Sequence, residues 1–469
     1  MSERGLNLKI ADFVIASILS SIHYLFTNLY DKHVPDPYMD EVFHIPQVRQ
    51  YCNGNYRDYD PMLTTPPLMY FLTVATFLCG RERAFNSIMI GLCYLAAAKY
   101  GLKQTKQANR WAAVAVCTLP VLFQTSCLYY TDMLSLTLVL AGLSMENKAG
   151  SAMVFMLSCL SRQTNIIWAG FYCFCGLIDH LKTVGDDVVV DGKRSSREKR
   201  KHDSTLKENS GSTAKKNNSS TVSSKANSSS ITSSFDYIKA TVYCVVLHWP
   251  FAILGAMFVY YLIWNDGSIV LGDKTAHQLH LHLPQLLYFL LFTMLSSSMH
   301  VLPRLSQVLR ISWYYKPLLV VISVFMALSV HYFSYTHPYL LADNRHYVFY
   351  IWNRFMLRYT YFKYAIIPGD ILSLVYFFHT LNASSVYFTL GLLLSTAATV
   401  IPAHLVEFRY FIIPYAIWRL NVNEKAPKCV CNFVEIVVNV ILIVVTTYLF
   451  VFHPFEWSHE PGRKQRFMW

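Results

Sequence analysis

The chain has 469 residues, of which 54% are hydrophobic and only 14% are charged, and its mean hydropathy is +0.31. Because a soluble domain carries about 25% charged residues, this composition excludes an ordinary soluble globular protein. The formal net charge is +12, but an excess of Lys and Arg in a membrane protein mainly sets its orientation. We therefore expect the chain to contact membrane lipid and to have no nucleic-acid partner.

Apolar runs of roughly 17–25 residues, the length of a membrane-spanning helix, recur along the whole chain. They predict an all-α polytopic membrane protein with roughly a dozen transmembrane helices. The first run, Ile10 to Tyr30, is longer than the apolar part of a signal peptide, and no small-residue cleavage site follows it. We interpret it as an uncleaved anchor that leaves the cytosol, so that residues 31–65 form the first lumenal loop.

This loop contains the stretch "PYMDEVFHIPQ", which predicts a short interfacial helix beginning near Asp40. An acidic residue in the first turn complements the helix dipole. Positions i and i+4 share a helix face, whereas i and i+1 do not. Asp40 and His44 are therefore expected to face one cavity while Glu41 points elsewhere. The alternative is that both carboxylates are solvated and only stabilise the start of the helix.

The next apolar stretch, Pro66 to Gly80, has only 15 residues and begins with two prolines. If it spanned the membrane, the basic segment "KQTKQANR" would lie in the lumen, against the positive-inside rule. We therefore predict that it re-enters or lies in the interface. Further spans are expected at Ala84–Gly101, Trp111–Leu128 and Met133–Met145, followed by two short spans on either side of "RQTN".

Residues Lys182 to Ser234 are rich in Ser, Asn and Lys and contain no aromatic residue. Such a segment cannot bury enough apolar surface to offset chain entropy, so it is expected to be disordered, and its basic run places it in the cytosol. It divides the chain into an N-terminal membrane module (1–180), the loop (181–236) and a C-terminal membrane module (237–469).

In the second module, the expected spans include Ile238–Trp264, Leu283–His300 and Pro317–Tyr335. With these spans, most acidic, histidine and arginine motifs face the lumen, which predicts one lumenal active cavity. We expect Asp40 near the start of the chain and the arginines near its end to meet in this cavity. Arginine suits phosphate recognition; the alternatives are snorkelling for the arginines at helix ends and simple solvation for Asp132. The lumenal set is Asp40, Glu41, His44, Asp132, Arg162, Asp273, His277, Asp343, Arg345, His346, Glu407 and Arg409.

Most of the 11 cysteines lie in apolar stretches and are expected to be buried free thiols. Cys429 and Cys431 form a C-x-C pair without a second pair, so a zinc site is not predicted.

Several motifs together carry a family resemblance: "PYMDEVFHIPQ", "YDPMLTTPP", "LYYTD", "RQTNIIW", "GSIVLGDKTAH", "HPYLLADNRHYVFYIW" and "EFRYFIIPY". Outside the Ser/Lys-rich loop, the chain resembles the endoplasmic-reticulum α-1,2-glucosyltransferases that add the last glucose to the dolichol-linked oligosaccharide. These enzymes belong to the GT-C superfamily. The resemblance implies a GT-C fold, an endoplasmic-reticulum membrane location and a lumenal active site.

The resemblance also implies the substrates: dolichyl phosphate β-glucose as donor and a diglucosylated, dolichyl-diphosphate-linked oligosaccharide as acceptor. An α linkage made from a β donor inverts the anomeric carbon, which requires one carboxylate as base. The leaving group is an anionic phosphate that needs no general acid, and Arg and His can stabilise it without a metal or other cofactor. We assume that the enzyme is a monomer.

By likeness to the acidic pair of GT-C enzymes, Asp40 is the first candidate for the base and Glu41 the second. Arg345, His346 and Arg409 are candidates for the donor phosphate, although the chain lacks the Lys that precedes the Glu of the "E-x-R-[FY]" motif in related mannosyltransferases. Candidates for orienting the substrates are His44, Asp132, Arg162, Asp273, Lys274 and Asp343. Candidates for stacking on sugar faces are Tyr38, Tyr129 and Trp352; the favoured interpretation of most aromatic residues, however, is a belt at the lipid interface. The rival interpretations are a polar-solute transporter and a non-catalytic membrane regulatory partner.

Overall fold

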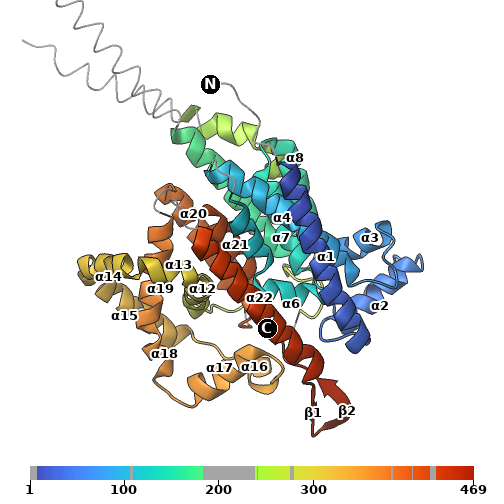
Figure 1. Cartoon of the computed structure of the whole chain (residues 1–469). Coiled ribbons are helices and arrows are strands. Elements are labelled where there is room, and N and C mark those ends of the chain that lie inside the picture. Colours follow the sequence, from blue (N-terminus) through green and yellow to red (C-terminus); the bar gives the residue numbers. More distant parts are fainter. Residues whose placement is uncertain are drawn as a thin grey trace, which may run out of the picture.

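The computed structural model describes residues 8–105, 109–182, 238–239, 241–274, 279–381, 384–403, 405–422 and 429–469, which fold mainly into helices (Figure 1). The loop predicted to be disordered lies almost entirely outside the described residues. A long helix, α1 (Ile10–His33), runs from one end of the molecule to the other. The start of α1 and α8 lie at one end, and the polar segments that carry the candidate site residues lie at the other (Figure 1).

Helix α4 (Ala84–Thr105) forms the centre of the N-terminal half, where it packs against α1 and α7 (Asp132–Ser144). Small residues allow this close packing. A Cβ added at Gly91 would lie 2.4 Å from Ser20 Oγ and 3.1 Å from the Ala16 carbonyl oxygen of α1. Helix α8 (Lys148–Cys159) packs on the other side of α7, followed by η1 (Gln163–Asn165) and a helix over residues 166–182.

The expected single helix over 111–128 is wrong. The structure has two shorter helices, α5 (Arg110–Cys117) and α6 (Pro120–Ser126). Proline disfavours the helical conformation of the residue before it, and Leu119 accordingly has ψ 121°. The chain therefore breaks at Leu119 and restarts with Pro120 in the first turn.

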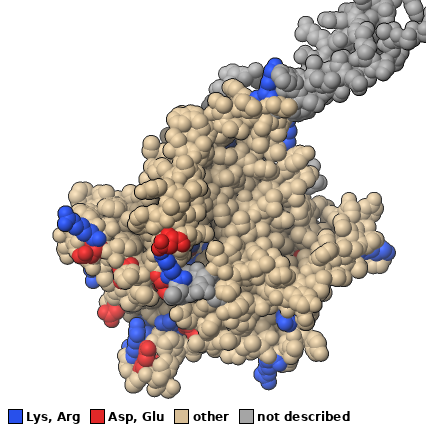
Figure 2. All heavy atoms as spheres, turned by 180° about the vertical axis from the view of Figure 1, so that it is seen from behind, with Lys and Arg blue, Asp and Glu red and all other residues tan. Residues whose placement is uncertain are grey.

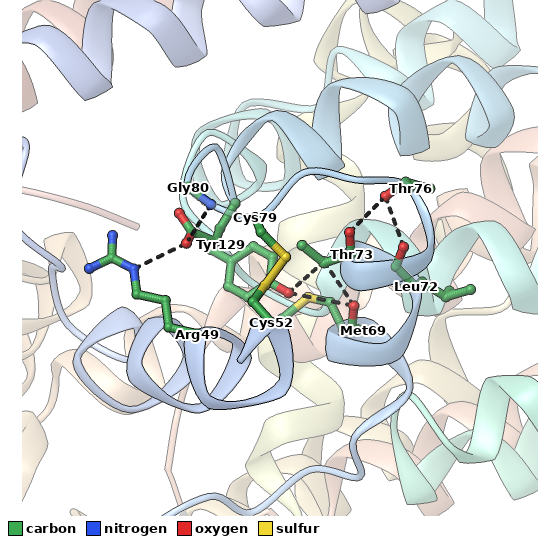
Figure 3. Close-up of a disulfide and its surroundings, with 10 residues drawn as sticks. Arg49, Cys52, Met69, Leu72, Thr73, Thr76, Cys79, Gly80 and Tyr129 are labelled. Carbon is green, nitrogen blue, oxygen red and sulfur yellow. Dashed lines mark hydrogen bonds and ion pairs between the residues drawn. A yellow bond between two sulfur atoms is a disulfide. The ribbon is translucent and has the colours of Figure 1, made fainter. Parts of the chain in front are cut away.

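The first polar loop carries two short helices, α2 (Glu41–Cys52) and α3 (Leu68–Ala75). With eight residues, α3 extends for about 12 Å, which is too short to cross a bilayer. A disulfide joins Cys52 at the end of α2 to Cys79 beyond α3 (Figure 3). The expectation of free thiols is wrong for these two cysteines, whereas Cys93, Cys117, Cys127 and Cys244 are buried free thiols as predicted.

In the C-terminal half, α12 (Pro284–Ser296) packs against α19 (Ile367–Thr380), and α22 (Cys429–Phe452) packs against α5 and α6 of the N-terminal half. Two apolar helix pairs are sharply bent, by 67° between 241–247 and α11 and by 76° between α12 and the segment 298–314. The longer elements of this half are α11 (Trp249–Trp264), α12 (Pro284–Ser296), α13 (Ser298–Val301), η2 (Leu302–Arg304), α14 (Leu305–Tyr314), α15 (Lys316–Phe333), α19 (Ile367–Thr380), α20 (Val386–Val400), α21 (Ile412–Asn421) and α22 (Cys429–Phe452).

Several shorter elements of the C-terminal half lie at the end of the molecule opposite the start of α1 (Figure 1). The last two are antiparallel strands, with Phe455 opposite Gln465 and Glu456 opposite Lys464. The set comprises α16 (Pro338–Ala342), α17 (Tyr347–Ile351), the π-helix η3 (Trp352–Leu357), α18 (Phe362–Ala365), η4 (Phe408–Phe411), β1 (Phe455–Trp457) and β2 (Glu460–Gln465).

Within the described residues, three helices are long and apolar enough to cross a membrane: Ile10–His33, Lys316–Phe333 and Val430–Phe452. The number rises to five if each bent pair counts as one span. Figure 2 shows a mostly uncharged surface, with the charged side chains scattered mainly over its lower part. The chain is thus a helical protein with several apolar helices typical of a multi-pass membrane protein; the dozen spans and the GT-C arrangement stay predictions.

Candidate active site

Asp40 lies at the N-cap of α2, immediately after a tight turn. Met39 in this turn has φ +55°, a left-handed conformation that is rare outside glycine. The Asp40 N–H donates to Tyr130 Oη at 3.2 Å, and its carbonyl oxygen accepts the His44 N–H at 3.1 Å. The side chain of Asp40 is 44% exposed, so the structure leaves its carboxylate accessible to a substrate.

Glu41, the next residue, has a different environment. Its carboxylate is fully buried and accepts two N–H groups of Arg83, at 2.8 and 2.7 Å. It also accepts the backbone N–H groups of Tyr129 at 2.7 Å and Tyr38 at 3.1 Å. Because four donors saturate this buried carboxylate, the assignment of Glu41 as the second candidate for the base is corrected to a structural role.

Arg409 brings the C-terminal half to Asp40. Its Nη1 lies 2.9 Å from Asp40 Oδ2, although the two residues are 369 positions apart. Its Nε and Nη2 bind Glu407 Oε2 at 2.8 and 2.7 Å, and its guanidinium lies over the Tyr130 ring, 5.1 Å from the ring centroid. The expected meeting of an early aspartate and a late arginine is therefore present in the structure.

The charges of this pair are mutually stabilised. Burial raises the pKa of Asp40, but Arg409, His44 and His346 together outweigh burial and hold this pKa below its ordinary value. Burial likewise lowers the pKa of Arg409, but Glu407 and Asp40 raise it well above its ordinary value. Asp40 is therefore an anion and Arg409 a cation at neutral pH.

His44 lies one turn after Asp40 on α2, and the two interact electrostatically, as the i, i+4 spacing predicts. Its Nδ1 is 2.6 Å from Tyr70 Oη. Burial lowers the pKa of His44 to about 4, despite the attraction of Asp40. The imidazole is therefore neutral at pH 7 and serves as a hydrogen-bonding group rather than a cation.

Asp132 and Arg162 form a second ion pair beside this cluster. Arg162 Nη2 lies 3.0 Å from Asp132 Oδ1, and its Nε donates to Thr131 Oγ1 at 3.0 Å. Asp132 is the first residue of α7 and is buried. Both charges influence the pKa of His44, which places the pair within electrostatic range of the Asp40 cluster.

The segment before α17 carries Asp343, Arg345 and His346. Arg345 binds both carboxylate oxygens of Asp343, at 2.8 and 2.7 Å, and lies over the Trp457 ring at 4.8 Å. His346 Nε2 lies 3.9 Å from Asp343 Oδ2. His346 also lowers the pKa of Asp40 electrostatically, so the structure brings this segment to the same site.

Asp273 and Lys274 lie on the same end of the molecule but in a separate contact with the first loop. The Asp273 N–H donates to the Pro61 carbonyl oxygen at 3.0 Å. Lys274 Nζ lies 3.2 Å from the Asn265 carbonyl oxygen and 3.4 Å from Asp266 Oδ2. Asp273 therefore contacts the first loop, and Lys274 contacts residues 265–266. His277 lies outside the described residues.

The three candidate aromatic residues, Tyr38, Tyr129 and Trp352, are all buried. Tyr129 is buried and bonds Thr73 Oγ1 through its hydroxyl at 2.6 Å, and Trp352 is buried against Tyr288. These positions correct the stacking role expected for both, because a ring enclosed by the protein core cannot lie on a sugar. Tyr38 is also mostly buried, and its hydroxyl bonds the backbone of Arg466 at 2.8 Å.

Sequence reasoning missed three contributors: Tyr130, which binds both Asp40 and Arg409; Arg83, which holds Glu41; and the segment after β2. Tyr130 lies within the "LYYTD" motif, so a signal was present for this residue. Arg83 and the last segment gave no signal, because their partners are distant in sequence. Among the described residues, no group of three or more His, Cys, Asp and Glu side chains could hold a metal ion.

The model of the DIE2/ALG10 family matches residues 34–420. A protein of Arabidopsis thaliana is 31% identical over 496 residues, covering 93% of this chain and 95% of its own. Proteins of Homo sapiens and Drosophila melanogaster are also 31% identical and cover 95% and 92% of this chain and 96% and 94% of their own.

All three relatives bear the name Dol-P-Glc:Glc(2)Man(9)GlcNAc(2)-PP-Dol alpha-1,2-glucosyltransferase. No solved structure matches the chain.

Proposed function

The chain belongs to the DIE2/ALG10 family, and on that premise we propose that it is the glucosyltransferase that completes the lipid-linked oligosaccharide for N-glycosylation. It moves glucose from dolichyl phosphate β-glucose to the terminal glucose of a diglucosylated, dolichyl-diphosphate-linked oligosaccharide. The observation that carries this proposal is the 31% identity over 93% of the chain to a relative named for this activity.

Asp40 is the base in this proposal. It takes the proton of the acceptor 2-hydroxyl while the hydroxyl oxygen forms a bond to C1 of the donor glucose. The bond between C1 and the phosphate oxygen breaks on the opposite face, and its electron pair leaves with dolichyl phosphate. The accessible, ionised carboxylate of Asp40 supports this role, because a base must reach the substrate proton in its deprotonated form.

Arg409 is the principal group for the donor phosphate. A guanidinium has five N–H donors, and the structure uses three of them, two on Glu407 and one on Asp40. The remaining donors suit a phosphate oxygen. A phosphate bound there weakens the hold of Arg409 on Asp40 and so frees the base as the charge of the leaving group develops. Arg345 adds positive charge, and His346 adds a hydrogen-bonding group, on the neighbouring segment.

The other candidates have supporting roles. Neutral His44 hydrogen-bonds a sugar hydroxyl, and the Asp132–Arg162 pair orients the donor glucose next to it. Asp343 holds Arg345 in position, and Asp273 with Lys274 contacts the more distant part of the acceptor. The N-terminal membrane module (1–180) supplies the base, and the C-terminal membrane module (237–469) supplies the phosphate contacts.

The active site faces the lumen of the endoplasmic reticulum in this proposal. Disulfides persist in the oxidising lumen and are rare in the cytosol. The Cys52–Cys79 disulfide (Figure 3) holds the last residue of α2, and Asp40 is the N-cap of the same helix. The disulfide thus supports a lumenal position for the whole first loop. The segment 271–273 packs on this loop through backbone hydrogen bonds to Thr64 and Pro61, which supports the same side for it.

The test is a transfer assay with purified protein in proteoliposomes, radiolabelled dolichyl phosphate glucose and a diglucosylated lipid-linked acceptor. We expect an acceptor enlarged by one glucose, no product from dolichyl phosphate mannose or from a monoglucosylated acceptor, and full activity with a chelator present. Absence of product with both correct substrates would overturn the proposal. Uptake of a polar solute into protein-containing vesicles would instead support the rival transporter.

A further inference from the structure

Beyond α22, the chain turns through the β1–β2 hairpin and returns toward the active site (Figure 1). Residues 465–469, which we call the strap, then run between two segments of the site. Along one side, the strap meets the loop that carries Asp40. Tyr38 Oη donates to the Arg466 carbonyl oxygen at 2.8 Å and accepts the Arg466 N–H at 2.8 Å.

Along its other side, the strap meets the segment that carries Arg345 and His346. The Met468 N–H donates to the Arg345 carbonyl oxygen at 2.9 Å, and the Tyr347 N–H donates to the Met468 carbonyl oxygen at 3.0 Å, which makes a parallel bridge. His346 Nδ1 lies 3.1 Å from the Trp469 carbonyl oxygen. The strap thus fixes the backbone on both sides of His346.

The Arg466 side chain anchors the strap to two membrane helices. Its Nη1 donates to the carbonyl oxygens of Phe450 and Val451 at 2.6 and 2.8 Å, and its Nη2 donates to that of His33 at 3.3 Å. These carbonyl groups end α22 and α1, where the helix dipoles favour a cation. The guanidinium is buried, so the anchor depends on protein groups rather than on solvent.

From this geometry we propose that the strap is a positioning element that holds Asp40 and the Arg345–His346 segment in register for transfer. Arg466 and Tyr38 are its positioning residues, and neither touches the reacting atoms. The inference rests on the proposed function. The strap lies beyond residue 420, where the family match ends, so nothing in that match assigns it a role. A misplaced phosphate-binding group costs rate because reaction requires near-attack geometry.

The test compares Arg466→Gln with Arg463→Gln, a matched control three positions away whose side chain is 65% exposed and lies 3.6 Å from Glu460. We expect Arg466→Gln to lower kcat/KM for dolichyl phosphate glucose by about tenfold or more, with KM for the acceptor unchanged. Arg466→Lys should recover part of this loss, because it keeps the cation at the helix ends. Arg463→Gln should match the wild-type protein.

Tyr38→Phe is the second variant, because it removes only the two hydrogen bonds to the strap and keeps the buried ring. It should lower kcat/KM for the donor several-fold at an unchanged Tm. The proposal is overturned if Tyr38→Phe and folded Arg466→Gln both keep the wild-type donor kinetics. It is also overturned if Arg466→Gln lowers kcat/KM only in proportion to a loss of folded protein while Tyr38→Phe has no effect.

Hydrogen exchange gives a readout that does not depend on activity. The Tyr347 and Met468 amides should exchange faster in Arg466→Gln than in Arg463→Gln, because the bridge loosens when its anchor is lost. Equal exchange rates in the two variants would overturn the proposed positioning role of the strap. If the wild-type protein is inactive but the two variants differ in exchange as expected, the proposed glucosyl transfer is overturned and the role of the strap is still supported.

Discussion

Two regions of this protein contain the same kinds of side chain, an arginine, a carboxylate and a histidine. The site cluster is Asp40, His44, Glu407 and Arg409, and the core cluster is His300, Arg419, Asn432 and Glu435. In the core cluster, Arg419 Nη2 binds Glu435 Oε2 at 2.7 Å and Asn432 Oδ1 at 2.6 Å, and His300 Nε2 lies 3.0 Å from Glu435. It joins α13, α21 and α22.

The two clusters differ in access rather than in composition. The side chains of Arg419 and Glu435 are each 1% exposed, whereas that of Asp40 is 44% exposed. Protein groups surround the Glu435 carboxylate, but the Asp40 carboxylate still faces an accessible space. A charged cluster in an apolar chain is therefore not by itself a sign of catalysis, and the accessible carboxylate is the feature that marks the site.

The largest effect on stability is expected when a charge is removed from the core cluster. We predict that Glu435→Gln lowers the free energy of unfolding by about 3–5 kcal/mol, because it leaves the buried Arg419 cation without its counter-ion. Thermal unfolding in detergent checks this, with exposed Glu146→Gln as the control. Normal stability with abolished transfer would make the core cluster a second functional site.

Removal of the Arg409 cation from the site cluster should lower activity rather than stability. We predict that Arg409→Gln lowers kcat/KM for the donor about 10²–10³-fold, the range for a group that stabilises developing charge, with little change in Tm. The steady-state kinetics of the folded variant measure this. A large loss of stability with normal kinetics would instead make Arg409 equivalent to Arg419.

The disulfide gives a further test of the difference between the two clusters, because it holds α2, which belongs to the site cluster and not to the core cluster. Cys52 and Cys79 are 27 positions apart, and we predict that Cys52→Ser with Cys79→Ser lowers the free energy of unfolding by about 3 kcal/mol. Transfer per folded molecule should also fall, since α2 carries Asp40. A reductant should reproduce both effects in the wild-type protein and have no further effect on the double variant.

A further prediction concerns pH. Burial lowers the pKa of His44 from 6.5 to about 4, so the unfolded chain binds this proton more readily than the folded protein. Stability from this group is complete above pH 6.5 and falls as the pH decreases toward 4, by roughly 3 kcal/mol in all. His44→Gln should have a shallower decline of Tm over this range. An unchanged slope would contradict the burial of a neutral His44.

Some of the site could be predicted from the sequence, because it depends on local spacing. The i, i+4 relation of Asp40 and His44 follows from helix geometry. The roles of Asp40 and Glu41 could not be separated by composition, because the difference depends on Arg83, whose approach to Glu41 is a tertiary contact. The meeting of Asp40 with Arg409 was expected only from the span count and the family resemblance.

The helical class of the fold and the positions of several helices could be predicted from the sequence. For example, α4 begins at Ala84 as predicted, and it ends at Thr105 rather than at Gly101. Pro120 was a visible helix breaker, yet the continuous apolar run concealed the break. The Cys52–Cys79 pairing depends on how α2 meets the end of α3, and the strap, with the sequence QRFMW, is too short to show a periodicity. Neither pattern has a local signature, so both required coordinates.

The measurement that tests Asp40 most directly is the single-turnover rate of Asp40→Asn with saturating donor and acceptor. Asparagine keeps the size of the side chain and one acceptor oxygen but cannot take the hydroxyl proton. We predict a rate about 10²–10⁴-fold below that of the wild-type protein, with unchanged donor affinity and Tm. A rate within a few-fold of the wild-type value would contradict the assignment of Asp40 as the base.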